Sequence, residues 1–203
     1  KYKFNNIKVI TNKINIGPSL SFFKAFDYVR GKWIVFCDQD DIWSRNKLKV
    51  LHSNVQLYKN YNGFLHNGKY ISDIENCIGI NMNPIVNGEL IYKNEPNLKL
   101  NSLLKRNKVV GCMSIFNFKF LKEKIYIYPP NYIFHDYWIS LLVATYSEIK
   151  FIKDPLIKYR RHQNNYSLKK RRSFFRKIID RLIMIFYLIL NHLLKKISNF
   201  SSY

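Results

Sequence analysis

Cysteine is scarce in this 203-residue chain, which contains three: Cys37, Cys77 and Cys112. An odd and widely spaced set argues against a disulfide framework and against the paired spacing of a zinc finger. Cys37 and Cys112 each lie inside an apolar run, where free cysteine behaves as a small buried hydrophobe. A reducing cytoplasm is therefore the simplest setting for the chain.

Long apolar runs and glycine-rich loops are also missing. The longest apolar run, Leu182–Leu190, is far shorter than the roughly 20 residues of a membrane-spanning helix. The chain has 7 glycines and no glycine-rich phosphate loop that ends in lysine. Nucleotidyl transfer from a nucleotide donor therefore lacks support in the sequence.

Acidic residues are few, with 13 Asp and Glu against 34 Lys and Arg, so the formal net charge is +21. Such a charge predicts attraction to anionic lipid, phosphorylated substrates or nucleic acid. Neither zinc-finger spacing nor an RNA-recognition aromatic motif accompanies the charge, so nucleic acid is not an expected partner. An apolar fraction of 47% favours a folded chain with a sizeable core.

The first forty residues predict a strand, a helix and a second strand. Ile7–Thr11 has the pattern of a short buried strand. After a loop, Ser19 is placed to cap a helix that Gly31 ends. Trp33–Cys37 is a continuous apolar run, which is typical of a central parallel strand covered on both faces. This order is a βαβ unit and predicts an α/β fold.

The remaining chain continues the alternation of strands and helices. Helices are expected at Leu48–Tyr58, Leu98–Leu104 and Asp136–Tyr146, and strands at Phe64–Ile71, Val109–Phe118, Ile149–Ile152 and Leu156–Tyr159. Beyond Lys169, a dense basic stretch leads into an amphipathic or buried helix.

Three carboxylates, Asp38, Asp40 and Asp41, crowd the end of the Trp33–Cys37 run. Their mutual repulsion is costly unless a cation or water offsets it. A solvated turn or a helix cap is the alternative, because Asp favours both. Ligands of open α/β sheets bind beyond strand ends, and carboxylates suit Mg²⁺ or Mn²⁺. In so basic a chain, acids at this position favour a metal site.

Five stretches in order resemble family 2 glycosyltransferases, closest to their rhamnosyltransferase-like subset. The resemblance spans about residues 7–167 and is strongest at the metal-binding signature Phe36–Trp43, which is followed by Lys47 and Leu48. The other stretches are Asn15–Gly17 with Ser19, Gly111–Met113, His135–Trp138, and Tyr159–His162 with Asn165 and Ser167.

The resemblance implies a GT-A fold and inversion at the anomeric carbon. Asp40 would be the main ligand of a divalent metal, Mg²⁺ or Mn²⁺, with help from Asp38, and Asp136 would be the general base. The implied donor-binding residues are Asn15, Gly17, Asp38, Asp41, Arg161 and His162, and the implied acceptor-binding residues are Gly111, Cys112 and Trp138.

Several of these residues have simpler interpretations that the sequence leaves open. Asp136 can cap a helix, and Trp138 can belong to the core. Arg160, Arg161 and His162 suit a diphosphate, yet they can equally be a cationic surface run. Asn15 and Gly17 can form an ordinary turn.

We expect two regions: a glycosyltransferase domain over residues 1–168 and a basic amphipathic segment over residues 169–203. Only about thirty residues precede Trp33, so the first strand–helix unit of the fold is expected to be missing. A basic amphipathic helix can lie on anionic lipid. The expected location is thus cytoplasmic, peripheral at the inner face of the cell membrane.

The expected function is transfer of a sugar from a UDP- or dTDP-sugar to a growing cell-surface polysaccharide or a lipid-linked glycan. The alternative is a degenerate or truncated family member that only binds a partner or a membrane. The short lead before Trp33 is the feature that favours this alternative.

Overall fold

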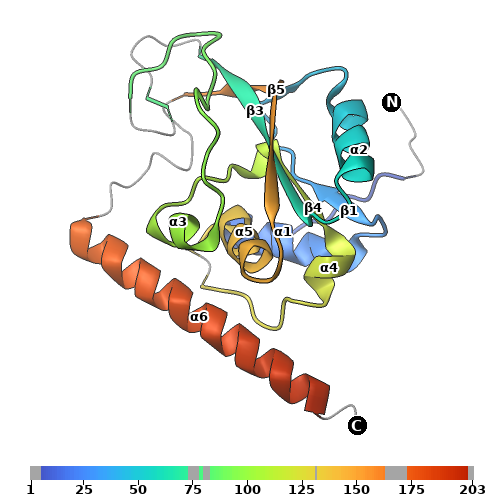
Figure 1. The fold of residues 1–203 in the computed structure, drawn as a ribbon, viewed down its shortest axis with the longest axis vertical. Helices are drawn as coiled ribbons and strands as arrows, with labels where there is room; N and C mark the ends of the chain where they lie inside the picture. Colours follow the sequence, from blue (N-terminus) through green and yellow to red (C-terminus); the bar gives the residue numbers. More distant parts are fainter. Residues whose placement is uncertain (1–5, 73–77, 80–82, 131, 163–172, 201–203) are drawn as a thin grey trace.

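The computed structural model describes residues 6–72, 78–79, 83–130, 132–162 and 173–200. Within them, five strands and several helices alternate along the chain (Figure 1). The strands are β1 Trp33–Val35, β2 Ile42–Trp43, β3 Gly63–Ile71, β4 Ser114–Asn117 and β5 Ile149–Arg160. The helices are α1 Gly17–Ala25, α2 Lys47–Leu57, α3 Leu100–Lys105, α4 Phe118–Lys122, α5 His135–Tyr146 and α6 Phe174–Phe200, with 3₁₀ turns η1 Phe26–Tyr28 and η2 Gly111–Met113.

The strands form one mixed sheet in the order β1-β4-β3-β5-β2. Only β3 and β5 are parallel, and the other three pairings are antiparallel. The expectation of a central parallel strand at Trp33–Cys37 is therefore wrong: β1 lies at the edge of the described sheet, antiparallel to β4. The run is apolar because helices cover both faces of the sheet. This covering occurs with antiparallel as well as parallel neighbouring strands.

The predicted strand at Ile7–Thr11 is also wrong, because this segment forms no strand. Ile7 and Val9 are 65% and 85% exposed. A strand needs a hydrogen-bonded neighbour, and no strand among the described residues pairs with this segment. The expected βαβ unit is accordingly not formed in the part of the chain that the structure describes.

Helices cover both faces of the sheet (Figure 1). On one face, Leu51 of α2 packs with Phe64, Ile115, Ile152 and Leu156. On the other face, α1, α3 and α5 cover a larger core. Adjacent strand residues divide between the two faces, as the pleat requires: Phe64 and Ile115 belong to the first cluster, and Leu65 and Phe116 to the second.

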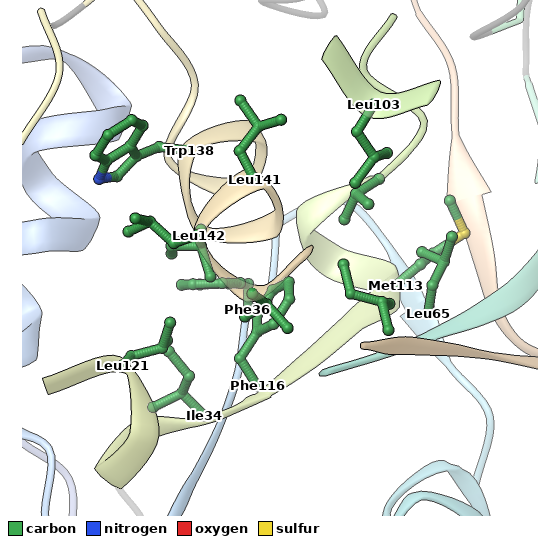
Figure 2. Packing of buried hydrophobic residues seen from close by; sticks show 14 of the residues in the cluster. Ile34, Phe36, Leu65, Leu103, Met113, Phe116, Leu121, Trp138, Leu141 and Leu142 are labelled. Atoms are coloured by element: carbon green, nitrogen blue, oxygen red, sulfur yellow. The ribbon is translucent and has the colours of Figure 1, made fainter. Parts of the chain in front are cut away.

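The larger core is built around α5. Figure 2 shows Trp138, Leu141 and Leu142 on this helix, and all three belong to one apolar cluster with Phe36, which follows β1, and Phe116 of β4. Burial on this scale stabilises each large apolar side chain by about 1.5–3 kcal/mol relative to its exposed state. The same packing fixes the N-terminal turn of α5, which carries His135 and Asp136.

Three element boundaries differ from the sequence-based expectations. Helix α1 begins at Gly17, whose φ of +79° suits glycine, and Ser19 lies buried inside the helix without capping it. The expected strand over Val109–Phe118 divides into η2, β4 and the start of α4. The strands expected at Ile149–Ile152 and Leu156–Tyr159 form one continuous strand, β5. The pairing of β5 with β3 shifts register beside Asn67, which lies opposite Pro155.

Helix α6 is a 27-residue helix that lies along the outside of the molecule and contacts α3 (Figure 1). One face packs on the core through Met184, which is 1% exposed. The expected C-terminal helix is thus present. None of the described helices is long and apolar enough to cross a membrane.

Candidate active site

The loop that follows β1 brings two of its three carboxylates together with a buried thiol. Ligand atoms of Asp38, Asp41 and Cys112 all lie within 4.8 Å of one another. Cys112 comes from η2, more than seventy positions further along the sequence, and is 0% exposed. This grouping is compact enough to hold a cation through oxygen atoms.

Burial dominates the electrostatics of these groups. It raises the pKa of the Asp41 carboxyl to about 6, although the Cys112 thiol and the Arg160 backbone N–H favour the ionised form. Burial, followed by the charge of Asp40, also raises the pKa of Asp38. Burial and the two acids raise the pKa of the Cys112 thiol well above its ordinary value, so the thiol stays protonated.

Asp40 faces a different partner. Its Oδ2 lies 2.9 Å from Nε2 of His162, which follows the end of β5. Both side chains are partly exposed. The structure therefore brings together Asp40, a predicted metal ligand, and His162, a predicted donor-binding residue. The two side chains contact each other directly.

Arg160 braces the same loop. Its backbone N–H donates to Oδ1 of Asp41 at 2.9 Å, and its Nε donates to the carbonyl oxygen of Asp40 at 3.1 Å. The sequence placed Arg160 in a cationic run suited to phosphate. It did not reveal this bracing, because 120 residues separate the two partners.

Lys47 is a site residue whose role the sequence did not reveal. It begins α2, its side chain is 1% exposed, and its Nζ donates to the carbonyl oxygen of Cys112 at 2.7 Å. The same nitrogen lies 4.0 Å from the centre of the Trp43 ring. Burial lowers the pKa of Lys47 to about 8, and the charges of Asp41 and Asp38 oppose that shift. The only sequence signal was its place after the acidic signature.

Asp136 contacts the neighbouring residue of η2, Gly111. Its Oδ2 accepts a hydrogen bond from the Gly111 N–H at 2.9 Å, and its Oδ1 accepts one from the Tyr137 N–H at 2.6 Å. Burial raises the pKa of Asp136 to about 7, and the charge of Asp38 adds to the rise. The helix-cap alternative is wrong, because Phe134 holds the N-cap position of α5.

A side chain at position 111 would crowd this contact. A Cβ at position 111 would lie 3.3 Å from Nε2 of His135 and 3.4 Å from Cβ of Asp136. His135 itself is buried between aromatic rings, with Phe22 stacked on it at 4.0 Å and Phe36 edge-on at 4.7 Å. Burial lowers the pKa of His135 to about 4, so its ring is neutral.

Other predicted site residues lie apart from this group. Trp138 is 0% exposed in the core, so its indole offers no surface to an acceptor and the core interpretation holds. Arg161 is 2% exposed, and its Nε donates to the carbonyl oxygen of Ile78. Asn15 accepts from the Gly17 N–H in a turn before α1. Asn165 and Ser167 lie outside the described residues.

Comparison with known proteins decides the family. The family model described as "Glycosyl transferase family 2" matches residues 1–123, which is more than half of the chain. The chain belongs to glycosyl transferase family 2. This membership confirms the predicted family and its reaction class, glycosyl transfer. The match ends before α5, so the role of Asp136 depends on the geometry described above.

Two known proteins resemble this family 2 chain over most of its length. The Escherichia coli UDP-Glc:alpha-D-GlcNAc-diphosphoundecaprenol beta-1,3-glucosyltransferase WfgD is 27% identical over 201 residues, covering 93% of this chain and 72% of WfgD. The crystal structure of S. aureus TarS 1-349 in complex with UDP-GlcNAc matches 89% of this chain with a TM-score of 0.62 and 16% identity. The chain spans half of that TarS chain. The likeness confirms a GT-A type fold.

Proposed function

We propose that this chain transfers a sugar from a nucleotide-sugar, such as a UDP- or dTDP-sugar, to a hydroxyl of a glycan or lipid-linked glycan, with inversion at the anomeric carbon. One observation carries the proposal: adjacent residues of η2 contact two different sets of carboxylates in a family 2 chain. Asp38 and Asp41 contact the Cys112 side of η2, and Asp136 accepts the Gly111 N–H. Asp38 and Asp41 are thus available to the leaving diphosphate, and Asp136 is available to the attacking hydroxyl.

Asp136 is the proposed general base. A sugar hydroxyl attacks well only when a neighbouring group takes its proton, and a base is most effective when its pKa lies near the working pH. A pKa of about 7 meets this condition. The N–H groups of Gly111 and Tyr137 fix the carboxylate, and each oxygen keeps a further lone pair for the proton.

The acidic loop is the proposed site of Mg²⁺ or Mn²⁺. Oδ2 of Asp41 is buried without a hydrogen-bond partner other than the weakly donating Cys112 thiol nearby. Hard divalent cations prefer carboxylate oxygens, so Asp38 and Asp41 fit such an ion and the protonated thiol does not. Asp40 stays a proposed ligand beside His162. When bound, the metal would act as a Lewis acid on the leaving diphosphate.

The remaining residues have proposed roles in binding. His162 contacts Asp40 of the acidic loop and can donate to a phosphate, and Asn15 and Gly17 shape a loop for the nucleotide. Arg161 is buried, so its proposed effect on the donor is indirect, through the chain near Ile78. Gly111 and Cys112 would border the acceptor through the η2 turn.

The proposed acceptor sets the proposed location. WfgD, by its name, acts on a sugar joined to diphosphoundecaprenol. A similar acceptor would place this chain at the inner face of the cell membrane, where its net charge of +21 favours anionic lipid. Residues 1–168 would form the catalytic domain and residues 169–203 the basic segment. Nucleic acid is not a proposed partner.

The test is a screen of UDP- and dTDP-sugars with a GlcNAc-diphospholipid acceptor, with Mn²⁺ or Mg²⁺ and with excess chelator. We expect transfer from one donor, loss of transfer in chelator, and loss in the Asp40→Asn variant. Asp27→Asn, at an exposed acid in η1, is the matched control. Full activity of Asp40→Asn in chelator would exclude the metal assignment. Donor binding without transfer to any acceptor would favour the degenerate-member alternative.

A further inference from the structure

One face of helix α6 packs on the rest of the protein through both apolar and polar side chains. Met184 and Asn191 are 1% and 0% exposed. The Asn191 side chain accepts from the N–H groups of Tyr126 and Ile127 and donates to the carbonyl oxygen of Lys124. Arg181 donates to the carbonyl oxygen of Lys105. These contacts fix which side of α6 faces the body and which side faces outward.

The outward side is apolar. Its exposed side chains recur every three or four positions along the helix, which places them on one stripe. We call these residues the outer stripe: Phe175, Ile178, Ile179, Leu182, Ile185, Phe186, Ile189, Leu193 and Ile197. Leu182, Phe186 and Ile189 at its centre are 60%, 59% and 56% exposed. An apolar surface that follows a whole helix of ~40 Å marks an interaction site.

Charge distinguishes the possible occupants. The cations of α6 gather near its two ends, Arg176, Lys177 and Arg181 at one and Lys195 and Lys196 at the other. Its one acid, Asp180, is buried and pairs with Arg176. A second copy docked antiparallel on the stripe would bring these like charges together, in two molecules of net charge +21. Anionic headgroups would instead meet cations at both ends of an apolar stripe.

We propose that the outer stripe lies in the surface of an anionic bilayer, with α6 parallel to the membrane and the opposite face of α6 holding the catalytic body. This inference rests on the proposed function, which places the chain at a membrane. It adds that the outer stripe is the surface that contacts the lipid. Because no described helix can span a membrane, the contact is interfacial.

Liposome sedimentation tests the proposal with vesicles of phosphatidylglycerol and phosphatidylcholine, or of phosphatidylcholine alone. We expect capture by the anionic vesicles, and a loss on the order of 100-fold in partitioning for the triple variant Leu182→Gln, Phe186→Gln and Ile189→Gln. The matched control replaces Val9, Leu57 and Val86 by Gln. These are exposed apolar residues outside α6, so the control should bind as the wild type does.

The charge contribution needs its own variants. Replacing exposed Lys177 and Lys196 by Gln should weaken capture and its dependence on salt, whereas the same change at exposed Lys49 and Lys59 should do so less. Equal capture of the stripe variant and its control would overturn the proposal. So would a lipid-free dimer, seen by sedimentation velocity, that the stripe variant dissociates.

Two further measurements separate this proposal from others. The stripe variant should keep the thermal midpoint of the wild type, and a large fall would mean that the stripe is core, which overturns the proposal. Nucleotide-sugar binding, measured without lipid, should be unchanged. Donor binding without vesicle capture would overturn this inference alone, and capture without donor binding would overturn the proposed function alone.

Discussion

At the scale of single residues, Asp136 shows how position decides chemistry. The sequence allowed both a helix cap and a general base. The structure places the residue inside the first turn of α5, with its Oδ2 held by an N–H from η2. Its Oδ1 accepts from the Tyr137 N–H in the same turn, so both carboxylate oxygens are held by backbone donors. Its burial costs stability when it is ionised, and this cost has a measurable consequence.

The folded chain should lose stability as pH rises through the titration of Asp136. Its pKa is raised by burial from 3.8 to about 7, so the folded state binds more protons than the unfolded state between these values. Stability from this group is therefore present below about pH 4 and is lost by about pH 7. The Asp136→Asn variant should therefore be more stable than the wild type at pH 8, with a free energy of unfolding larger by on the order of 1–2 kcal/mol. At pH 4 the two free energies of unfolding should be nearly equal.

Urea unfolding at the two pH values measures this difference. Asp154→Asn, at an exposed acid in β5, is the control and should change neither value. A destabilised Asp136→Asn at pH 8 would mean that the ionised carboxylate is held favourably and that its pKa is not raised.

Lys47 supplies a fixed positive charge beside the proposed metal site. No carboxylate lies within salt-bridge distance of it among the described residues, yet the charges of Asp41 and Asp38 act on it. Removing this cation should strengthen binding of a second one. We expect Lys47→Met to bind Mn²⁺ about threefold to tenfold more tightly in isothermal titration, and Lys47→Arg to bind it as the wild type does. Weaker binding by Lys47→Met would show that Lys47 builds the site.

At the scale of elements, helices were predicted better than strand partners. The apolar spacing of Leu48–Tyr58 and Asp136–Tyr146 located α2 and α5 within one or two residues. The run at Trp33–Cys37 located β1 but could not give its direction, since both faces are covered by helices whether a neighbour is parallel or antiparallel. Ile7–Thr11 has strand-like residues and no partner, which its own sequence cannot reveal.

The attachment of α6 to the body gives a prediction at this scale. Asn191→Ala removes three hydrogen bonds and leaves the N–H groups of Tyr126 and Ile127 without that partner. We expect the free energy of unfolding to fall by about 2–3 kcal/mol in urea. Ser198→Ala, at an exposed position of the same helix, is the control. An unchanged midpoint for Asn191→Ala would mean that α6 is not held by this contact.

At the scale of the whole molecule, the site is assembled from segments that only the fold brings together. The acidic signature is local in the sequence, and it identified Asp38, Asp40 and Asp41 directly. Their neighbours could not be found in that way, because Cys112 and Arg160 lie about 70 and 120 positions away. The net charge predicted an anionic partner, but only the packing of α6 shows which of its faces is exposed.

The central claim is that one carboxylate, Asp136, takes the proton of the attacking hydroxyl while the acidic loop holds the donor. Single-turnover transfer from a labelled nucleotide-sugar, measured beside equilibrium donor binding, tests it most directly. For Asp136→Asn we expect the transfer rate to fall by about 10²–10⁴, with donor affinity nearly unchanged. Loss of donor affinity together with the rate would place Asp136 in the donor site, and an unchanged rate would contradict the account.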